Sequence, residues 1–123
     1  MKTAISIFLV ATGLATSAFA APSSSCFRMR DVGNHSVADA KTLYLSVRQK
    51  QVYKLTMKGA CLATSSSSDP LITEIRGGGD TVCRPIDLDL KVDMSGMISP
   101  CIIDGVEKLT PEQVAAIPKK LRP

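Results

Sequence analysis

The stretch Ile86-Asp87-Leu88-Asp89-Leu90-Lys91-Val92-Asp93 decides the fold class of this chain. Its aliphatic residues occupy every even position and its charged residues every odd position, which is the two-residue period of a β-strand. A strand with one apolar and one charged face suits a sheet that covers a core on one side and meets water on the other, and such sheets are antiparallel. The pattern predicts an antiparallel strand over residues 86–93, with Ile86 among its inward-facing residues.

Two alternating runs earlier in the chain predict a β-hairpin. Each run carries three apolar residues on one face: Leu43, Leu45 and Val47 in the first, and Tyr53, Leu55 and Met57 in the second. If both sets face one core, Val47 opposes Tyr53 and Leu45 opposes Leu55. Residues 48–52 then connect the strands. Because this segment lacks Gly and Asn, we expect a five-residue loop or a bulge and not a tight two-residue turn.

The rest of the chain adds short strands, polar turns and one helix. Further strands are expected over residues 26–30, 71–76 and 97–104, and turns or loops at 33–34, 64–70, 77–80 and 94–96. Pro100 indicates an edge position or a bulge in its strand. The stretch Thr110-Pro111-Glu112-Gln113 combines an N-cap, a proline at the first helical position and a capping-box glutamine. It predicts a helix of about two turns that ends before Pro118.

Together these elements predict a mainly β fold: a small antiparallel β-roll or sandwich of five to seven short strands, with a short C-terminal helix and disulfide staples. We expect a single domain over residues 26–118, preceded by a leader at 21–25 and followed by a basic tail at 119–123. A domain of this size buries about two-thirds of its unfolded surface, so it holds a core of its own.

Residues 1–20 have the features of a secretory signal peptide. Lys2 supplies a positive start, residues 4–11 form an apolar run, and Ala18-Phe19-Ala20 places small residues at the cleavage site. The apolar run is shorter than the roughly 20 residues that a membrane-spanning helix needs. We expect cleavage after Ala20, a periplasmic or secreted location, and no integral membrane segment in the mature chain. Cys26 follows three serines, which does not match a lipoprotein cleavage site.

Four cysteines lie beyond the expected cleavage site: Cys26, Cys61, Cys83 and Cys101. An even number in an exported chain indicates two disulfides. The chain has no Cys-x-x-Cys motif, which argues against a redox dithiol or a zinc site. Three pairings are open. We favour Cys61–Cys83, which would close a loop rich in Ser and Gly, together with Cys26–Cys101, which would tie the first mature segment to the last strand.

The composition argues against nucleic-acid binding. The chain has 15 Lys and Arg against 11 Asp and Glu, and its net charge of +4 falls by one when Lys2 is removed. The basic residues are scattered except at 119–122, which we expect to be a solvated, frayed terminus. Aromatic residues are few and Trp is absent, so aromatic platforms for bases or sugars are not expected. Tyr44 lies on the wet face of its predicted strand, where it covers a second layer or contacts a partner.

The sequence assigns no catalytic, cofactor-binding or metal-binding residue. Asp31, His35 and the serines at 65–68 include the residue types of a hydrolytic triad, but the chain lacks a Gly-x-Ser-x-Gly motif. We expect His35 to be a surface residue beside a turn at Gly33-Asn34.

Two further patterns are interpreted as ordinary surface. Asp87, Asp89 and Asp93 share one face of a predicted strand, where alternate residues lie about 6.5–7 Å apart. A single cation would need further ligands from another segment of the chain, so a solvated strand face is the simpler interpretation. The glycines at 77–79 lack the Gly-Lys-Ser/Thr ending of a phosphate loop, although Arg76 and Arg84 flank them.

One family resemblance follows from the cysteine order and its neighbours. The chain has Cys26-Phe27 at the start of the mature domain, Val52-Tyr53-Lys54-Leu55 before Cys61, Val82-Cys83, and Cys101-Ile102-Ile103 leading into Leu109-Thr110. Over residues 26–117 it resembles a family of small exported proteobacterial proteins catalogued as a domain of unknown function (number 6491). Many members look like lipoproteins, whereas this chain lacks a lipoprotein site. The resemblance implies a location in the Gram-negative envelope and transfers no activity.

The sequence thus favours a non-enzymatic exported protein that binds or supports a component of the envelope, with an envelope protein as the expected partner and no cofactor. The alternative is a small secreted hydrolase or inhibitor whose site assembles from distant segments. For that alternative the candidate residues are Asp31, His35 and the loop between Arg76 and Arg84.

Overall fold

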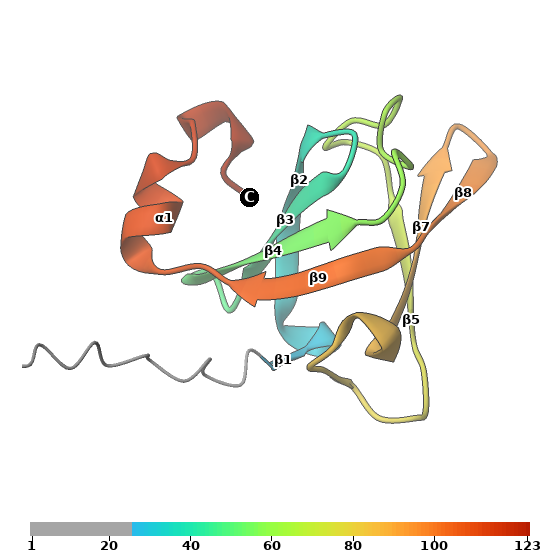
Figure 1. Cartoon of the computed structure of the whole chain (residues 1–123), viewed down its shortest axis with the longest axis horizontal. Coiled ribbons are helices and arrows are strands. Elements are labelled where there is room, and N and C mark those ends of the chain that lie inside the picture. Colours follow the sequence, from blue (N-terminus) through green and yellow to red (C-terminus); the bar gives the residue numbers. More distant parts are fainter. Residues whose placement is uncertain (1–25) are drawn as a thin grey trace, which may run out of the picture.

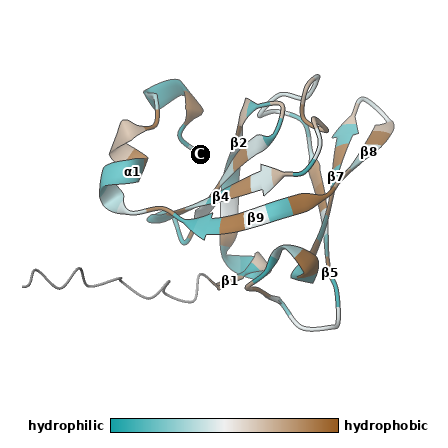
Figure 2. Cartoon of the chain, in the orientation of Figure 1, coloured by the Kyte–Doolittle hydropathy of each residue, from teal (hydrophilic) through white to brown (hydrophobic). Residues whose placement is uncertain are grey.

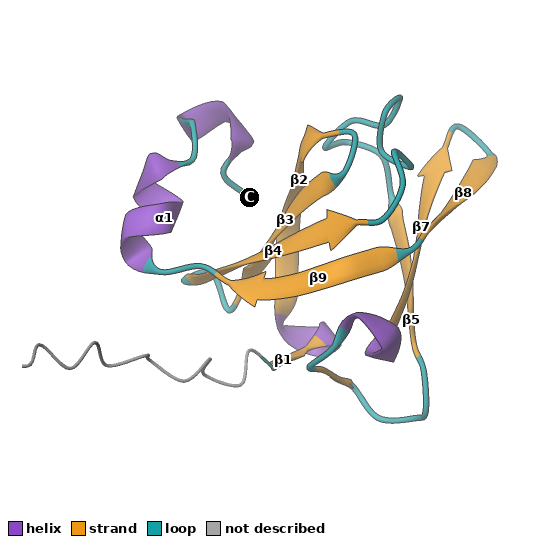
Figure 3. Cartoon of the chain, in the orientation of Figure 1, coloured by secondary structure: helices purple, strands orange, loops and turns teal. Residues whose placement is uncertain are grey.

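The computed structural model describes residues 26–123, so the expected signal peptide (1–20) and leader (21–25) lie outside the described residues. The described chain is mainly β, with three antiparallel sheets and one short α-helix (Figures 1 and 3). Seven of its strands have five or more residues. The strands are β1 (Phe27–Arg28), β2 (Val32–Asp39), β3 (Thr42–Val47), β4 (Gln51–Met57), β5 (Leu71–Ile75), β6 (Thr81–Val82), β7 (Leu88–Met94), β8 (Met97–Cys101) and β9 (Ile103–Lys108). The predicted fold class is confirmed.

The core lies between a four-stranded sheet, in the order β2-β3-β4-β9, and a three-stranded sheet, in the order β5-β7-β8. Leu43 and Leu55 from the first sheet and Leu90 and Val92 from the second are almost fully buried. Buried and half-buried residues alternate along β7 from Leu88 to Asp93, and hydrophobic and hydrophilic segments follow one another along the strands in Figure 2. The alternation read from the sequence therefore has its expected physical basis, because one face of each sheet lies in a shared core.

The stretch that predicted an antiparallel strand forms one from Leu88 onward, and β7 is the central strand of its sheet. The prediction was wrong at its first two positions. Pro85–Asp87 form a 3-10 helix, η2, and the side chain of Ile86 is 58% exposed. Pro85 begins this turn, and the carboxylate of Asp87 accepts backbone N–H bonds from Cys83 and Arg84. Local side-chain bonds of this kind compete with strand formation.

The β3–β4 hairpin has the predicted faces but a different register. Leu45 lies opposite Tyr53, Leu43 opposite Leu55 and Val47 opposite Gln51, so the predicted pairing was wrong by two residues. The connection is only residues 48–50, and Arg48 and Gln49 both have positive φ, at 52° and 61°. A shift of two residues keeps every side chain on its face. The absence of Gly did not exclude a tight turn, because the backbone N–H of Arg48 is held by the carbonyl of Asp31 at 2.9 Å.

The predicted turn at Gly33-Asn34 was also wrong, since both residues lie in β2. The ladder between β2 and β3 is irregular between Val32 and His35, which marks a bulge at Gly33 and Asn34. The hydroxyl of Ser46 accepts a bond from the backbone N–H of Asn34 at 2.8 Å. A Cβ at position 33 would come within 3.1 Å of that hydroxyl oxygen. Gly33 therefore allows the close approach that the bulge needs.

Both disulfides exist, but the favoured pairing was wrong. The bridges join Cys26 to Cys83 and Cys61 to Cys101. Strand pairing is the reason. β1 pairs with β6 so that Phe27 lies opposite Val82, which places the flanking Cys26 and Cys83 side by side. The favoured pairing was based on the composition of the loop between Cys61 and Cys83, and loop composition does not indicate which strands pair.

Other predicted features are confirmed. Pro100 lies in β8, which is an edge strand of its sheet. The glycines at 77–79 all have positive φ in the loop between β5 and β6. The helix α1 (Pro111–Ala116) begins after Thr110, whose side chain forms the predicted reciprocal capping box with Gln113.

The C-terminal segment packs against the outer face of the four-stranded sheet. Ile117 is buried outside the main core, and the 3-10 helix η3 (Lys119–Leu121) contacts β2. The guanidinium of Arg122 donates to the carbonyl oxygens of Ala115 at 2.7 Å and Ile117 at 2.9 Å. The basic tail is thus folded back and not frayed. It adds a second layer on the sheet face to which the half-buried Tyr44 belongs.

The helix cap gives a stability prediction. We expect Thr110→Ala to lower the free energy of unfolding by about 1 kcal/mol, because it removes the hydroxyl that accepts from the backbone N–H of Gln113 at 3.2 Å. Thr110→Ser keeps a hydroxyl and is the matched control. Urea unfolding of the two variants measures the difference, and equal stabilities would contradict the capping role.

The disulfides give a chemical prediction. Non-reducing peptide mapping of the protein by mass spectrometry should yield one peptide pair joined through Cys26 and Cys83 and another joined through Cys61 and Cys101. The same map should show a mature N-terminus at Ala21. A bridge between Cys61 and Cys83 would contradict the structure, and an intact N-terminal segment would contradict the signal peptide.

Candidate functional site

A polar cleft of about 400 Å³ lies where β1 and β6 meet the β3–β4 hairpin. Its apolar lining comes from the buried residues Phe27, Val47 and Tyr53. Its polar lining comes from four stretches of the chain and comprises Arg28, Asp31, Arg48, Gln51, Thr81 and Lys108. Three cationic side chains therefore share this cleft with one carboxylate.

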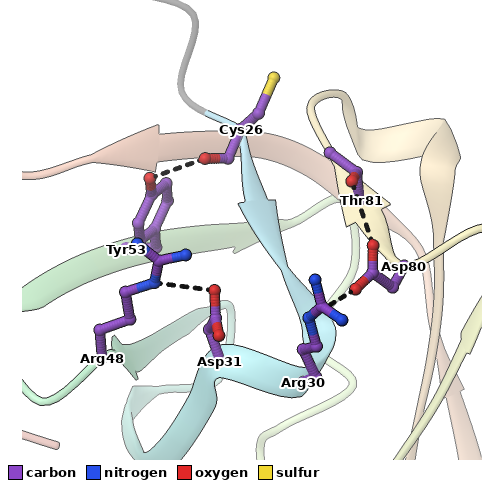
Figure 4. A network of polar contacts seen from close by, with 7 residues as sticks. All are labelled: Cys26, Arg30, Asp31, Arg48, Tyr53, Asp80 and Thr81. Atoms are coloured by element: carbon purple, nitrogen blue, oxygen red, sulfur yellow. Dashed lines mark hydrogen bonds and ion pairs between the residues drawn. The ribbon is translucent and has the colours of Figure 1, made fainter.

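The aromatic side of the cleft is fixed by the first disulfide and by Tyr53. The hydroxyl of Tyr53 donates to the carbonyl oxygen of Cys26 at 3.1 Å (Figure 4). The rings of Phe27 and Tyr53 pack with their centroids 4.8 Å apart. Burial raises the pKa of Tyr53, so its phenol stays protonated and remains a donor at neutral pH. The Cys26–Cys83 bridge holds this wall next to β6.

The side chain of Arg48 is oriented by Asp31. Its Nε lies 2.9 Å from Oδ2 of Asp31 (Figure 4). The backbone N–H of Arg48 also donates to the carbonyl oxygen of Asp31. Arg48 has a positive φ of 52°, a strained conformation for a side-chain-bearing residue. Such residues often occur at ligand-binding sites, where surrounding contacts hold them. Asp31 supplies those contacts and leaves the side chain of Arg48 64% exposed at the cleft.

The other two cationic groups of the cleft have no ionic partner among the described residues. Arg28 is exposed on β1, opposite Thr81. Lys108 ends β9, where it lies opposite Tyr53 and is also exposed. By contrast, Arg30 forms an ion pair with Asp80 at 3.1 Å, and Asp80 also accepts from Thr81 (Figure 4). The cleft thus has positive charge that intramolecular pairing does not neutralise.

A second groove of about 430 Å³ adjoins the cleft and shares Gln51 and Lys108 with it. Its other lining residues are Lys50, Leu109, Pro111 and Val114. This groove runs from the end of β9 to the first turn of α1, and it adds one more cation and an apolar wall. The two hollows together form an extended groove, which we call the cationic groove.

The structure does not bring the candidate triad residues together. Asp31 bonds Arg48 in the cationic groove. His35 lies on β2, half-buried, with Nε2 at 3.1 Å from the carbonyl oxygen of Asp69, so its expected place at a surface turn was wrong. Among the serines at 65–68, the hydroxyl of Ser65 donates to the carbonyl of Leu62.

The remaining charged candidates have structural partners. Arg76 pairs with Asp89 at 3.5 Å, and Arg84 pairs with Asp87 at 3.1 Å. Asp93 accepts the backbone N–H of Gly96 at 2.7 Å in the turn between β7 and β8. Across residues 26–123 no group of three or more His, Cys, Asp or Glu side chains is placed to hold a metal ion.

The cationic groove was not apparent from the sequence. Its charged residues are spread over residues 28–108, and only strand pairing brings them together. A correct hairpin register would have placed Gln51 beside Val47, but the residues of β1 and β9 would still have been unassigned.

Comparisons with known proteins add no relative. No family model, no curated protein and no solved structure matches the chain. Within the part of the chain that the structure describes, no helix has the length and apolar character needed to cross a membrane.

The carboxylate of Asp87 gives a pH prediction. The backbone N–H of Cys83, the guanidinium of Arg84 and the backbone N–H of Arg84 hold the pKa of Asp87 below its ordinary value. Its contribution to folding stability is therefore present above the pKa of the unfolded chain and is lost as pH falls through the lower pKa of the folded protein. Carboxyl-detected NMR titration should give a lower midpoint for Asp87 in the folded protein than in urea. Arg84→Gln should raise the folded midpoint part of the way, and equal folded and unfolded midpoints would refute the assignment.

Proposed function

We propose that this protein is an exported envelope protein of a Gram-negative bacterium that binds an acidic segment of a partner protein in the cationic groove. The observation that carries the proposal is the gathering of Arg28, Arg48 and Lys108 around one cleft with Asp31 as the only carboxylate of its lining. The two disulfides suit an oxidising compartment such as the periplasm or the extracellular medium. The proposal includes membership in the family of exported proteins that the cysteine pattern resembles.

The chemistry of the groove favours a carboxylate-bearing ligand. An arginine guanidinium presents a planar fork of donors that matches a carboxylate, and a lysine adds a point charge. Arg48 is already oriented by its bond to Asp31 at 2.9 Å, so less side-chain freedom is lost on binding. Arg28 and Lys108 add cationic donors that pair with no acidic side chain in the described part of the chain.

The shape of the groove favours a peptide over a small free anion. The cleft of about 400 Å³ and the adjoining groove of about 430 Å³ share Gln51 and Lys108. The second groove carries Leu109 and Val114 beside Lys50. A ligand that alternates acidic and apolar side chains would satisfy both parts, whereas inorganic phosphate would use only the first.

The proposal is tested by fluorescence anisotropy with a labelled peptide that alternates Glu and Leu. We expect the combined variant Arg28→Gln/Arg48→Gln/Lys108→Gln to bind at least about tenfold more weakly, since one charge-assisted bond contributes roughly 1.5–3 kcal/mol and 1.4 kcal/mol is about a factor of ten. The matched control, Lys41→Gln/Lys58→Gln/Lys120→Gln, removes the same charge from exposed positions elsewhere. Affinity should also fall as salt is raised.

Three further measurements define the outcome. A peptide in which Gln replaces Glu should not bind, and inorganic phosphate should compete only weakly. Equal binding by the groove variant and the control variant would refute the proposed site. Binding to vesicles that contain an anionic phospholipid, in the absence of peptide binding, would replace the protein partner with a lipid surface.

A further inference from the structure

The loop between β5 and β6 leaves a stretch of backbone open to solvent. Figure 1 shows it, in yellow, as an excursion from the lower end of β5. Arg76 and the three glycines that follow it are all exposed, and a Cβ built on any of Gly77, Gly78 or Gly79 would meet nothing within 4 Å. Between described residues, no backbone–backbone hydrogen bond involves these glycines. Because glycine also has the least restricted backbone, this stretch changes conformation at little cost.

The loop is fixed at both of its ends. The backbone N–H of Arg76 donates to the carbonyl oxygen of Asp87 at 2.9 Å, at the end of the ladder between β5 and β7. At the other end, the carbonyl oxygen of Asp80 accepts from the backbone N–H of Met29 at 2.7 Å. β5 is moreover an edge strand of its sheet. An enzyme that binds the loop in an extended form therefore has to open little more than the last bond of one edge strand.

Arg76 gives this loop a chemical identity. Its side chain is 58% exposed, and its guanidinium lies 3.5 Å from a carboxylate oxygen of Asp89. An exposed ion pair of this kind is weak, so the guanidinium is free to enter a stronger acidic site. Serine proteases of the trypsin class hold an arginine in a pocket with a carboxylate at its base. Exposed loops with small residues are the preferred sites of proteolytic cleavage, and here the small residues follow the arginine directly.

The two halves of the chain on either side of this loop are joined in several ways. Both disulfides cross it, since Cys26 and Cys61 precede the loop and their partners Cys83 and Cys101 follow it. The ladders β1–β6, β5–β7 and β4–β9 also each join a strand before the loop to a strand after it. A cut at Arg76 therefore breaks no bridge and removes no ladder.

We propose that the Arg76–Gly77 bond is a processing site for a serine protease that cleaves after arginine, and that the product is a folded two-chain protein held by both disulfides. In the reaction the bond between the carbonyl carbon of Arg76 and the nitrogen of Gly77 breaks. One water molecule is consumed, and its hydroxyl group converts the Arg76 carbonyl into a carboxyl group. Its remaining proton goes to the nitrogen of Gly77, which becomes an amine. This processing is independent of the cationic groove.

The flexibility of the loop favours a substrate over an inhibitor. A loop that inhibits a protease has to be preorganised in its bound shape, because ordering it on binding lowers the affinity. Three successive glycines without backbone bonds between described residues do not provide that preorganisation.

The test is limited proteolysis of the folded protein, with both disulfides intact, by a small amount of trypsin. The first product should be heavier by one water molecule and should migrate as one species without reductant. With reductant it should separate into two fragments, of which the second begins at Gly77. Arg76→Gln should slow the first cleavage at least about tenfold, because other sites have to open against ladder bonds. The matched control is Lys58→Gln, which should leave the rate unchanged. Lys58 also precedes a glycine in an exposed loop, but its backbone N–H is held by the carbonyl of Ile102 at 2.8 Å.

Three outcomes would overturn the proposal. The first is an initial cut at any other bond, read by mass spectrometry on the unaltered protein, or equal cleavage rates for the two variants. The second is lasting inhibition of trypsin with the Arg76–Gly77 bond intact, which would make the loop an inhibitor. The third concerns the two-chain product. Its amide NMR spectrum should match that of the uncut protein outside residues 74–82, and a collapse of that spectrum would show that the cut destroys the fold.

Discussion

The fold depends on the burial of two aliphatic faces against each other, one from the β3–β4 hairpin and one from β7. Leu43, Leu55, Leu90 and Val92 are almost fully buried at this contact, and each such side chain contributes roughly 1.5–3 kcal/mol when it leaves water. The alternate residues of the same strands must then face outward. That constraint places Lys91 and its acidic neighbours Glu74 and Asp89 on the outer face of the three-stranded sheet, where Lys91 forms ion pairs with both carboxylates.

The disulfides act at the margins of this core. The sheets hold the central strands, but β1 and β6 have only two residues each and form a sheet of their own. Such a short ladder is marginal by itself. The Cys26–Cys83 bridge, with a sequence separation of 57, restrains it and stabilises the folded chain mainly by restricting the unfolded one. The wall of the cleft at Cys26 and Phe27 is therefore held by this covalent bond together with the burial of Phe27 and Val82 in the core.

The sequence predicted what periodicity and local side-chain chemistry determine. It identified the buried faces of β3, β4 and β7, the edge position of Pro100 and the cap at Thr110, because each depends on neighbours within a few residues. It did not predict the hairpin register, since the turn at Arg48 is held by the distant Asp31. The prediction of the disulfide pairing was wrong for the same reason, and for that reason too the cationic groove was not predicted. Both follow from which strands pair, and in this chain residues near 27 meet residues near 82.

The cationic groove and the hollow between the two main sheets also differ in how the fold produces them. The cationic groove lies where short, disulfide-held strands leave charged side chains without acidic partners in the described chain. The hollow of about 260 Å³ between the two main sheets lies where the edge strands β2 and β5 do not pair within the described chain. The leucines of β3, β4 and β7 beneath it are already almost fully buried, so the missing ladder costs the core little. His35, the single histidine of the chain, lies beside this hollow, where its bond to the carbonyl of Asp69 helps to join β2 to the loop before β5 in place of a ladder.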